Sequence, residues 1–428
     1  MPDGARSDHP GVQAQLDRLA ELSPGGDRLG LERILELTEA LGRPQDRLPP
    51  VFHVAGTNGK GSTCAFLRAM LEAGGYRVHV FTSPHLVRFN ERIRLSGTLI
   101  DDAALESLLG EVLDHSGPIG PSFFEATAAA AFLAFARTPA DALLLEVGMG
   151  GRLDATNIVE RPLVTGIAAL GFDHQQWLGK TLAEIAGEKA GIVRRGVPLV
   201  TLAQEPEAAQ RITAIAAEHG APLFRQGQEW DVAATPIGMT YRDNHGTLDL
   251  SRPALVGAHQ IANAGLAIAI VRSQTALPLT PEALARGLAD VDWPARLQRL
   301  QPGPLIGERI VWLDGGHNPQ AAIALAEAMR PIAPFTLVLG VLATKDPREM
   351  ILPFAGLASA IHTVDVEGHA SFEPSALADL ARVVGIPATP FETLASAIAA
   401  APADRPLLIA GSLYLAGEVL RRNGQLPR

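Results

Sequence analysis

The chain has little of what secreted scaffolds and membrane proteins depend on. Cys64 is the single cysteine among 428 residues, so no intrachain disulfide can form and a secreted disulfide scaffold is excluded. No apolar run reaches the roughly 20 residues that span a bilayer; residues 126–136 form one of the longest and are too short. Residues 1–10 are polar and lack the apolar core of a signal peptide. These features predict a cytoplasmic protein that does not enter a membrane.

The chain also lacks an excess of positive charge. Its 36 Lys and Arg residues stand against 46 Asp and Glu residues, and the net charge of −10 argues against a general nucleic-acid binder. Local positive groups would have to hold any anionic substrate against the overall field. The content of 47% hydrophobic and 19% charged residues is typical of a globular protein, and the length is sufficient for two domains.

Strand-like and helix-like segments alternate along most of the chain. This alternation predicts βαβ units and a mostly parallel sheet with helices on both faces, an α/β fold. In the first part, strands are expected at Val51–Ala55 and residues 77–82, 141–147 and 198–202, and helices at residues 127–137 and 206–219. Nucleotides in such sheets bind beyond the carboxyl ends of the strands.

Between residues 229 and 250 the pattern changes to short strand-like runs. The sequence Asp243-Asn244-His245-Gly246 divides two of them and is typical of a hairpin turn, so we expect a small antiparallel appendage. A helix over residues 260–272 is expected to follow.

The alternation then restarts as a second, smaller α/β unit. Strands are expected at residues 309–313, 336–341, 360–366 and Leu407–Ala410, and helices at Pro319–Met329, Pro374–Val383 and residues 394–401. A proline within residues 292–296 interrupts the chain after a helix near residues 281–288. We therefore expect a P-loop-type N-terminal domain, residues 1–294, and a Rossmann-like C-terminal domain, residues 295–428.

One segment points directly to nucleotide binding. The apolar strand Val51–Ala55 leads into Gly56-Thr57-Asn58-Gly59-Lys60-Gly61-Ser62-Thr63, and a helix-like stretch follows. Glycines let backbone N–H groups turn towards a polyphosphate at a helix start, Lys60 can neutralise phosphate charge, and a hydroxyl can reach Mg²⁺. The spacing differs from the common P-loop, because two residues separate Gly56 from Gly59. An ordinary glycine-rich turn is the alternative, but the order of these features favours binding of a nucleoside triphosphate.

Polar residues follow several of the expected strands. Ser83 ends the second strand, and Glu146 ends the third, where a carboxylate beside a phosphate loop is well placed to hold Mg²⁺. The alternative for Glu146 is a carboxylate satisfied by neighbouring N–H groups. His174 follows an apolar run, but imidazole is an unusual Mg²⁺ ligand, so its assignment depends on its sharing the cleft with Glu146.

Lys189 and the segment 314–319 are more ambiguous. A lysine near a helix end ordinarily faces water, and the residues alone favour that interpretation. The alternative is that Lys189 is buried and that the pKa of its amine is lowered, which would let it react with CO₂ to form a carbamate. In the second half, Asn318 can cap a helix with Pro319 in its first turn. Asp314 and His317 would then point out of the sheet edge, towards a nucleotide on the first domain.

Together these segments resemble the folylpolyglutamate synthase/dihydrofolate synthase family of the Mur ligase superfamily. Residues 82–85 and 146–157 are the matches most specific to folate enzymes. Other matches, which extend from near residue 20 to the C-terminal helix, are residues 29–33, 56–62, 88–92, 173–174, 188–192, 314–319 and 411–414. The stretch between Asn157 and Asp173 is slightly longer than the family pattern.

The resemblance implies a role for each of these segments. ATP would be bound by Thr57, Asn58, Gly59, Lys60, Gly61, Ser62, Asn263, Arg296 and Asp314. Mg²⁺ would be bound by Ser83, Glu146 and His174, and Lys189 would be the family's carbamylated lysine. The pterin would lie along Ser122, Phe123, Phe124, Leu153, Asp154 and Ala155, with residues 22–25 as a loosely aligned further candidate. The catalytic residues would be Lys60, Glu146, His174 and Lys189.

The resemblance further implies ATP-dependent amide formation. The carboxylate of dihydropteroate or of a folyl(poly)glutamate would attack the γ-phosphate, and the amine of L-glutamate would then displace phosphate from the acyl phosphate. By analogy with bacterial relatives we expect both activities in one monomeric enzyme. The alternatives are a Mur-type ligase acting on a peptidoglycan precursor and a non-catalytic nucleotide-binding switch. A simple P-loop kinase would not explain a second domain bearing Asp314 and His317.

Overall fold

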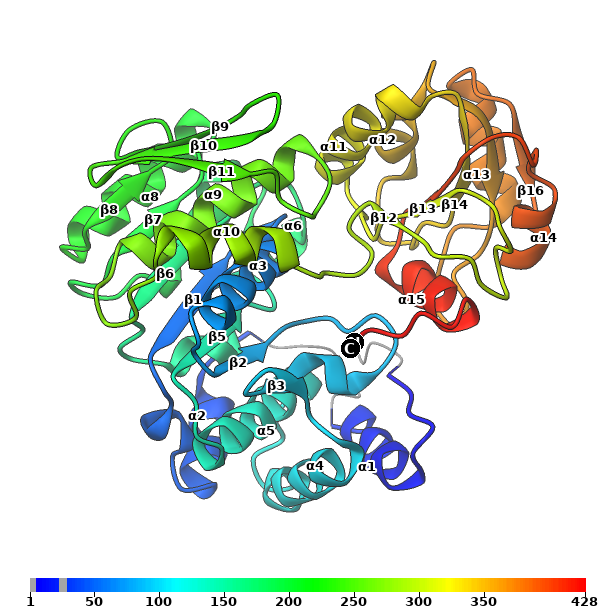
Figure 1. Cartoon of the computed structure of the whole chain (residues 1–428). Helices are drawn as coiled ribbons and strands as arrows, with labels where there is room; N and C mark the ends of the chain where they lie inside the picture. The colour runs from blue at the N-terminus through cyan, green and yellow to red at the C-terminus, as the bar shows by residue number, and fades with distance from the viewer. Residues whose placement is uncertain (1–4, 23–28) are drawn as a thin grey trace. The chain divides into compact units, whose positions relative to one another are not determined.

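The computed structural model describes residues 5–22 and 29–428, which divide into two compact units (Figure 1). The first comprises the described residues up to Ala254, together with Gln260–Asp292 and Arg428. The second comprises Leu255–His259 and Trp293–Pro427. The expected domain boundary after residue 294 stays a prediction.

The described part of the first unit contains an eight-stranded sheet in the order β4-β3-β2-β5-β1-β6-β7-β8. Its strands are β1 (Val51–Ala55), β2 (Val78–Phe81), β3 (Ile93–Leu95), β4 (Thr98–Leu99), β5 (Ala142–Glu146), β6 (Val164–Ile167), β7 (Leu199–Thr201) and β8 (Leu223–Arg225). The strands from β2 to β8 in this order pair in parallel, whereas β3 and β4 form an antiparallel edge. The expected mostly parallel α/β sheet is confirmed.

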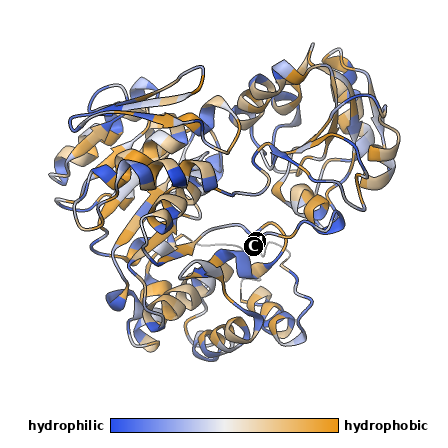
Figure 2. Cartoon of the chain, viewed as in Figure 1, coloured by the Kyte–Doolittle hydropathy of each residue, from blue (hydrophilic) through white to orange (hydrophobic). Residues whose placement is uncertain are grey.

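The order in which the chain adds strands reverses its direction at β1. The chain passes from β1 to β2 on one side, and after β5 it crosses β1 to reach β6 on the other side. Such a reversal of direction marks the position where open α/β sheets bind ligands, outside the carboxyl ends of the strands. Every residue of β1, β5 and β6 is buried, and Figure 2 shows the hydrophobic colouring along the central strands.

Helices cover this sheet. They are α1 (Pro10–Ala20), α2 (Glu32–Ala40), α3 (Lys60–Ala73), α4 (Asp102–Ser116), α5 (Phe123–Arg137), α6 (Gln175–Leu178), α7 (Leu182–Lys189), α8 (Pro206–Glu218), α9 (Ala258–Arg272) and α10 (Pro281–Asp290). Helices α1, α2, α4 and α5 share one hydrophobic core with β5, while α7 and α8 share another with β6 and β7. In the part of the chain that the structure describes, no helix is both long and apolar enough to cross a bilayer.

The expected helix over residues 127–137 begins four residues earlier, because Ser122 caps it. The Ser122 hydroxyl accepts from the backbone N–H of Glu125 at 3.2 Å, and the Glu125 carboxylate accepts from the N–H of Ser122 at 2.6 Å. This reciprocal pair satisfies two N–H groups that a helix start otherwise leaves unpaired.

The antiparallel appendage is confirmed as a three-stranded sheet of β9 (Trp230–Ala234), β10 (Gly238–Asp243) and β11 (Gly246–Ser251). Asp243 pairs with Gly246 across the expected hairpin turn. Asp243 also forms an ion pair of 2.6 Å with Arg272 of α9, which ties the appendage to the first unit.

In its described residues, the second unit has a six-stranded sheet in the order β12-β13-β17-β14-β15-β16, parallel except for β12. The strands are β12 (Gln298–Arg299), β13 (Val311–Leu313), β14 (Phe335–Leu339), β15 (Ala358–Thr363), β16 (Ala388–Pro390) and β17 (Leu407–Ala410). The helices are α11 (Pro319–Met329), α12 (Pro347–Ile351), α13 (Pro374–Val383), α14 (Leu394–Ala399) and α15 (Leu413–Arg422). The second α/β unit is therefore confirmed, with one antiparallel strand that the sequence did not reveal.

Candidate active site

The glycine-rich turn joins β1 directly to α3. Gly59 caps the helix with φ of 87°, and the first bond within the helix runs from the N–H of Thr63 to the carbonyl of Gly59. The N–H groups of residues 60–62 therefore lie at the helix start without partners inside the helix, where they can bind an anion. The N–H groups of Thr57 and Asn58 instead donate to the carbonyl of Ala169, at 2.9 and 3.1 Å, and fix the turn against the segment after β6.

Asn263 lies against this turn from α9. A Cβ atom at Gly59 would stand 2.4 Å from Oδ1 of Asn263, and one at Gly56 would stand 2.8 Å from Cβ of Ala168. Both positions therefore require glycine, because neighbouring atoms leave no room for a Cβ atom and because the backbone φ is positive. The structure brings Asn263 together with the residues predicted to hold the phosphates, and this cradle fits a nucleotide.

Replacing Gly59 by alanine should weaken ATP binding. Gly75 provides a matched control, because its φ is also 87° but a Cβ atom added there would meet nothing within 4 Å. Each alanine would have to adopt the left-handed backbone conformation, so we expect each substitution to lower the free energy of unfolding by about 1 kcal/mol. Gly59→Ala alone should also raise the KM for ATP, by about tenfold, because the added carbon displaces Asn263. Equal KM values for ATP in the two variants would contradict this.

Two lysines meet at the start of the turn. Nζ of Lys60 and Nζ of Lys189 both donate to the carbonyl oxygen of Gly56, at 3.1 and 3.0 Å. Lys189 is 4% exposed, so the expectation that it faces water is wrong. Burial, and then the charge of Lys60, lowers the pKa of Lys189 to about 7, although Asp173 and Asp154 act in the opposite direction. A large fraction of this amine is therefore neutral at physiological pH.

Glu146 and Ser83 lie side by side at the carboxyl edge of the sheet. Phe81 of β2 pairs with Leu145 of β5, and the N–H of Ser83 donates to Oε2 of Glu146 at 3.3 Å. Glu146 is 5% exposed. A carboxylate and a hydroxyl are oxygen donors of the kind that Mg²⁺ prefers, so this pair fits the ion.

His174 lies on the loop after β6, in a left-handed conformation with φ of 51°. Its side chain is 46% exposed, and its Nε2 lies 3.9 Å from Oδ1 of Asp173. Within residues 5–22 and 29–428, no three Asp, Glu, His or Cys side chains gather into a metal site. The expected set contains only two such residues, Glu146 and His174, so the metal assignment stays a prediction.

Phe124, from one of the two segments predicted to hold the pterin, lies against Gly148. A Cβ atom there would stand 2.4 Å from Cζ of Phe124, whose ring centroid lies 5.9 Å from that of Phe81. Phe123 and Ala155 are buried, Leu153 is half-buried, and the Ser122 hydroxyl is used as the cap of α5. Residues 23–25 of the further candidate segment lie outside the described residues.

Asp154 is buried among hydrogen-bond donors. Its carboxylate accepts from the backbone N–H groups of Met149 and Thr156, at 2.8 and 3.0 Å, and from the Thr156 hydroxyl. Burial raises the pKa of Asp154, and these hydrogen bonds counteract the effect. In this structure Asp154 therefore holds the turn that follows β5.

Arg296 and Asp314 come together within the second unit, beside the carboxyl end of β13. Asp314 accepts from the N–H groups of Leu297 and Gly316, at 2.8 and 2.7 Å. Arg296 lies between two residues of positive φ, Ala295 at 56° and Leu297 at 42°. Asn318 caps α11 as expected, because its Oδ1 accepts from the N–H of Ala321 at 2.9 Å.

The sequence did not single out His259, which the structure places in the same unit. Burial lowers the pKa of His259, while the charge of Asp314 raises it and that of Arg296 lowers it. The side chains of Asp314 and Arg296 therefore both lie within electrostatic reach of His259. The available signal was the polar pair His259-Gln260 in the first turn of α9, the helix that also carries Asn263.

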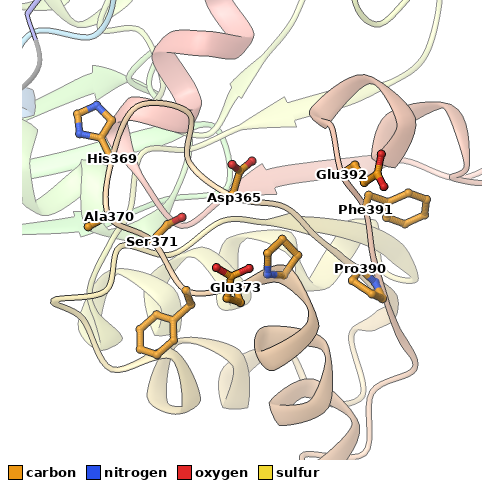
Figure 3. Close-up of a pocket in the computed structure, with 10 residues that line it drawn as sticks. Asp365, His369, Ala370, Ser371, Glu373, Pro390, Phe391 and Glu392 are labelled. Carbon is orange, nitrogen blue, oxygen red and sulfur yellow. The ribbon is translucent and has the colours of Figure 1, made fainter.

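The second unit also has a cavity of about 770 Å³ at the carboxyl ends of β15 and β16. Figure 3 shows Asp365 and Glu373 on the connection from β15 to α13, and Glu392 on the segment after β16. None of the residues predicted to bind ATP, metal or pterin lines this cavity.

Known proteins resemble this chain over most of its length. Residues 54–271 match the Mur ligase middle domain, and residues 304–422 match the dihydrofolate synthetase C-terminal domain. The dihydrofolate synthase/folylpolyglutamate synthase of Bacillus subtilis is 39% identical over 355 residues, which cover 79% of this chain and 81% of that protein. The structure of E. coli FolC in complex with DHPP and ADP is 33% identical, with a TM-score of 0.86 over 95% of this chain and 97% of that one.

A further solved structure is a bifunctional folylpolyglutamate synthase/dihydrofolate synthase with Mn, AMPPNP and L-glutamate bound. It is 32% identical, with a TM-score of 0.84 over 95% of this chain and 97% of that one. The chain belongs to the folylpolyglutamate synthase/dihydrofolate synthase family of the Mur ligase superfamily.

Proposed function

We propose that this protein is an ATP-dependent ligase that joins L-glutamate to the carboxylate of dihydropteroate and of folyl(poly)glutamates. The observation that carries the proposal is the arrangement at Gly56, where Lys60 and the buried Lys189 share one carbonyl oxygen at the start of a phosphate-binding helix. Membership of the family supports the same substrates, since its relatives carry these activities in their names.

The residues of the first unit would act mainly by positioning and charge. The helix start at residues 60–62 and the ammonium group of Lys60 would hold the ATP phosphates, with Asn263 alongside. Glu146, Ser83 and His174 would hold Mg²⁺, which when bound neutralises the developing phosphate charge. We assign Arg296 and Asp314 to ATP contacts from the second unit. Attack of the pterin carboxylate on the γ-phosphate would give an acyl phosphate, which the amine of glutamate converts to an amide with release of phosphate.

Lys189 would act as a carbamate. Its neutral amine would attack CO₂: a C–N bond forms, one C=O π bond opens and one proton is released, so an uncharged amine becomes a carbamate group of charge −1. The lowered pKa supplies the neutral amine that this step requires, and the carbamate oxygens are hard donors suited to Mg²⁺. We also propose that the enzyme is a cytoplasmic monomer.

An ADP-release assay tests the function. With ATP and Mg²⁺, we expect ADP to form only when L-glutamate and either dihydropteroate or a reduced folate monoglutamate are both present. Reactions without glutamate, and reactions with UDP-muramoyl compounds in place of the pterin, are the controls. Turnover only with a UDP-muramoyl compound would show a Mur-type ligase instead, and ATP binding without any turnover would show a switch protein.

A further inference from the structure

A buried hydrogen-bonded chain leads from the middle of β1 to the turn that follows Glu146. Nε2 of His53 lies 2.9 Å from Oγ1 of Thr156, and the Thr156 hydroxyl donates to Oδ1 of Asp154. His53 and Thr156 are fully buried, and Asp154 is 4% exposed. Bulk water therefore cannot replace any of these hydrogen bonds.

At its Asp154 end, this series of hydrogen bonds fixes the backbone of the turn that follows β5. Oδ2 of Asp154 accepts from the N–H of Met149, the residue that follows Gly148, at 2.8 Å. Gly148 lies directly against the ring of Phe124, so a shift of this turn would move the aromatic surface. The same turn begins directly after Glu146, at the end of β5.

With Asp154 as an ionised carboxylate, these hydrogen bonds have one consistent arrangement of protons. The Thr156 hydroxyl has a single hydrogen and gives it to Asp154, so its oxygen must accept from His53. His53 therefore carries its proton on Nε2 and leaves Nδ1 unprotonated, and Nδ1 indeed has no hydrogen-bond partner. Burial and the charge of Arg194 lower the pKa of His53 to about 3, so the ring is neutral.

We infer that His53 and Thr156 are positioning residues of the ligase: the ring N–H of His53 orients the Thr156 hydroxyl, which holds Asp154 on the turn between Glu146 and the Phe124 surface. Neither residue contacts substrate in this scheme. The inference rests on the proposed function for its kinetic consequence, since Phe124 and Asp154 belong to the segments assigned to the pterin.

Thr156→Val tests the inference, because it keeps the shape of the side chain and removes the hydroxyl. Thr165→Val is the matched control. Thr165 is also fully buried, pairs with His53 across the β1–β6 ladder, and donates its hydroxyl to the carbonyl of Pro198 at 3.1 Å. Thr156→Ser keeps the hydroxyl and serves as the conservative variant.

In steady-state kinetics, Thr156→Val should raise the KM for dihydropteroate about tenfold while the KM for ATP stays within about twofold of the unmodified value. Thr156→Ser should restore the KM for dihydropteroate, and Thr165→Val should change neither constant. An unchanged KM for dihydropteroate in Thr156→Val, an equal rise in both KM values, or failure of serine to restore the value would overturn the inference.

A second measurement needs no activity. Nitrogen NMR of histidine-labelled protein should show, among the ring signals, one that stays in the Nε2–H form throughout pH 5.5–8 and disappears in His53→Gln. A ring of His53 that carries its proton on Nδ1, or becomes charged in this range, would overturn the inference. Failure of the unmodified protein to release ADP would instead reject the proposed function, because the NMR result stands without substrate.

Discussion

Replacing Glu146 by alanine should abolish glutamate-dependent ADP release, with a loss of about a thousandfold, because the proposed metal site would lose its buried carboxylate. Of the two neighbouring residues at the carboxyl edge of β2 and β5, Glu146 carries a charge and Ser83 is neutral. The loss should appear in kcat, since the carboxylate acts on charge that develops during phosphoryl transfer. Steady-state ADP release as a function of Mg²⁺ concentration is the measurement.

Glu146→Gln separates charge from structure. The amide oxygen can still accept the N–H of Ser83, so the thermal midpoint should change little while activity remains at least about a hundredfold below normal. Near-normal activity in either variant would remove Glu146 from the metal site.

Replacing Lys189 by alanine should reduce ADP release by about a thousandfold, because the carbamate can no longer form. Lys180→Ala is the control, since Lys180 is an exposed lysine just before α7, the helix that Lys189 ends. Small carboxylates such as acetate should restore part of the activity of Lys189→Ala, because they supply oxygens to the space that the side chain leaves. Activity above about a tenth of normal in Lys189→Ala would contradict the assignment.

The pH dependence of the carbamate follows from the lowered pKa of Lys189. CO₂ reacts with the neutral amine, which at a pKa of about 7 is roughly nine-tenths of the total at pH 8 and one-tenth at pH 6. The carbamate signal in ¹³CO₂-labelled protein should therefore weaken as the pH falls through 7. A signal of constant intensity between pH 6 and pH 8 would show that the amine does not titrate in this way.

The elements that the sequence predicted best are those with strong local patterns. Strand β1 and helix α11 have the expected bounds, because a largely apolar run and an Asn-Pro start identify them without tertiary information. Strands β3, β4 and β12 were missed, since each has two or three residues and depends on a neighbour for its hydrogen bonds. Helices α1, α2 and α4 were also not predicted, although they complete the core around α5.

The site residues likewise divide into those that local sequence predicts and those that depend on tertiary packing. Ser83 and Glu146 could be predicted because both follow strands whose carboxyl ends must meet at one edge of a parallel sheet. Burial of Lys189 could not, since it depends on how α7 packs beside the Gly56 turn. The hydrogen bond between His53 and Thr156 joins residues 103 positions apart, and nothing in their local sequence indicates it.

The shared carbonyl of Gly56 links two chemical equilibria. Because Lys60 and Lys189 lie on one oxygen atom, any charge that arrives at the turn acts on both amines. Triphosphate without a metal ion favours protonated lysines and so opposes carbamate formation, whereas a divalent cation favours it. By thermodynamic reciprocity, carbon dioxide should tighten the binding of the cation and loosen that of the bare nucleotide. With Lys189 carbamylated as proposed, dissolved inorganic carbon should therefore influence how this enzyme responds to its magnesium supply.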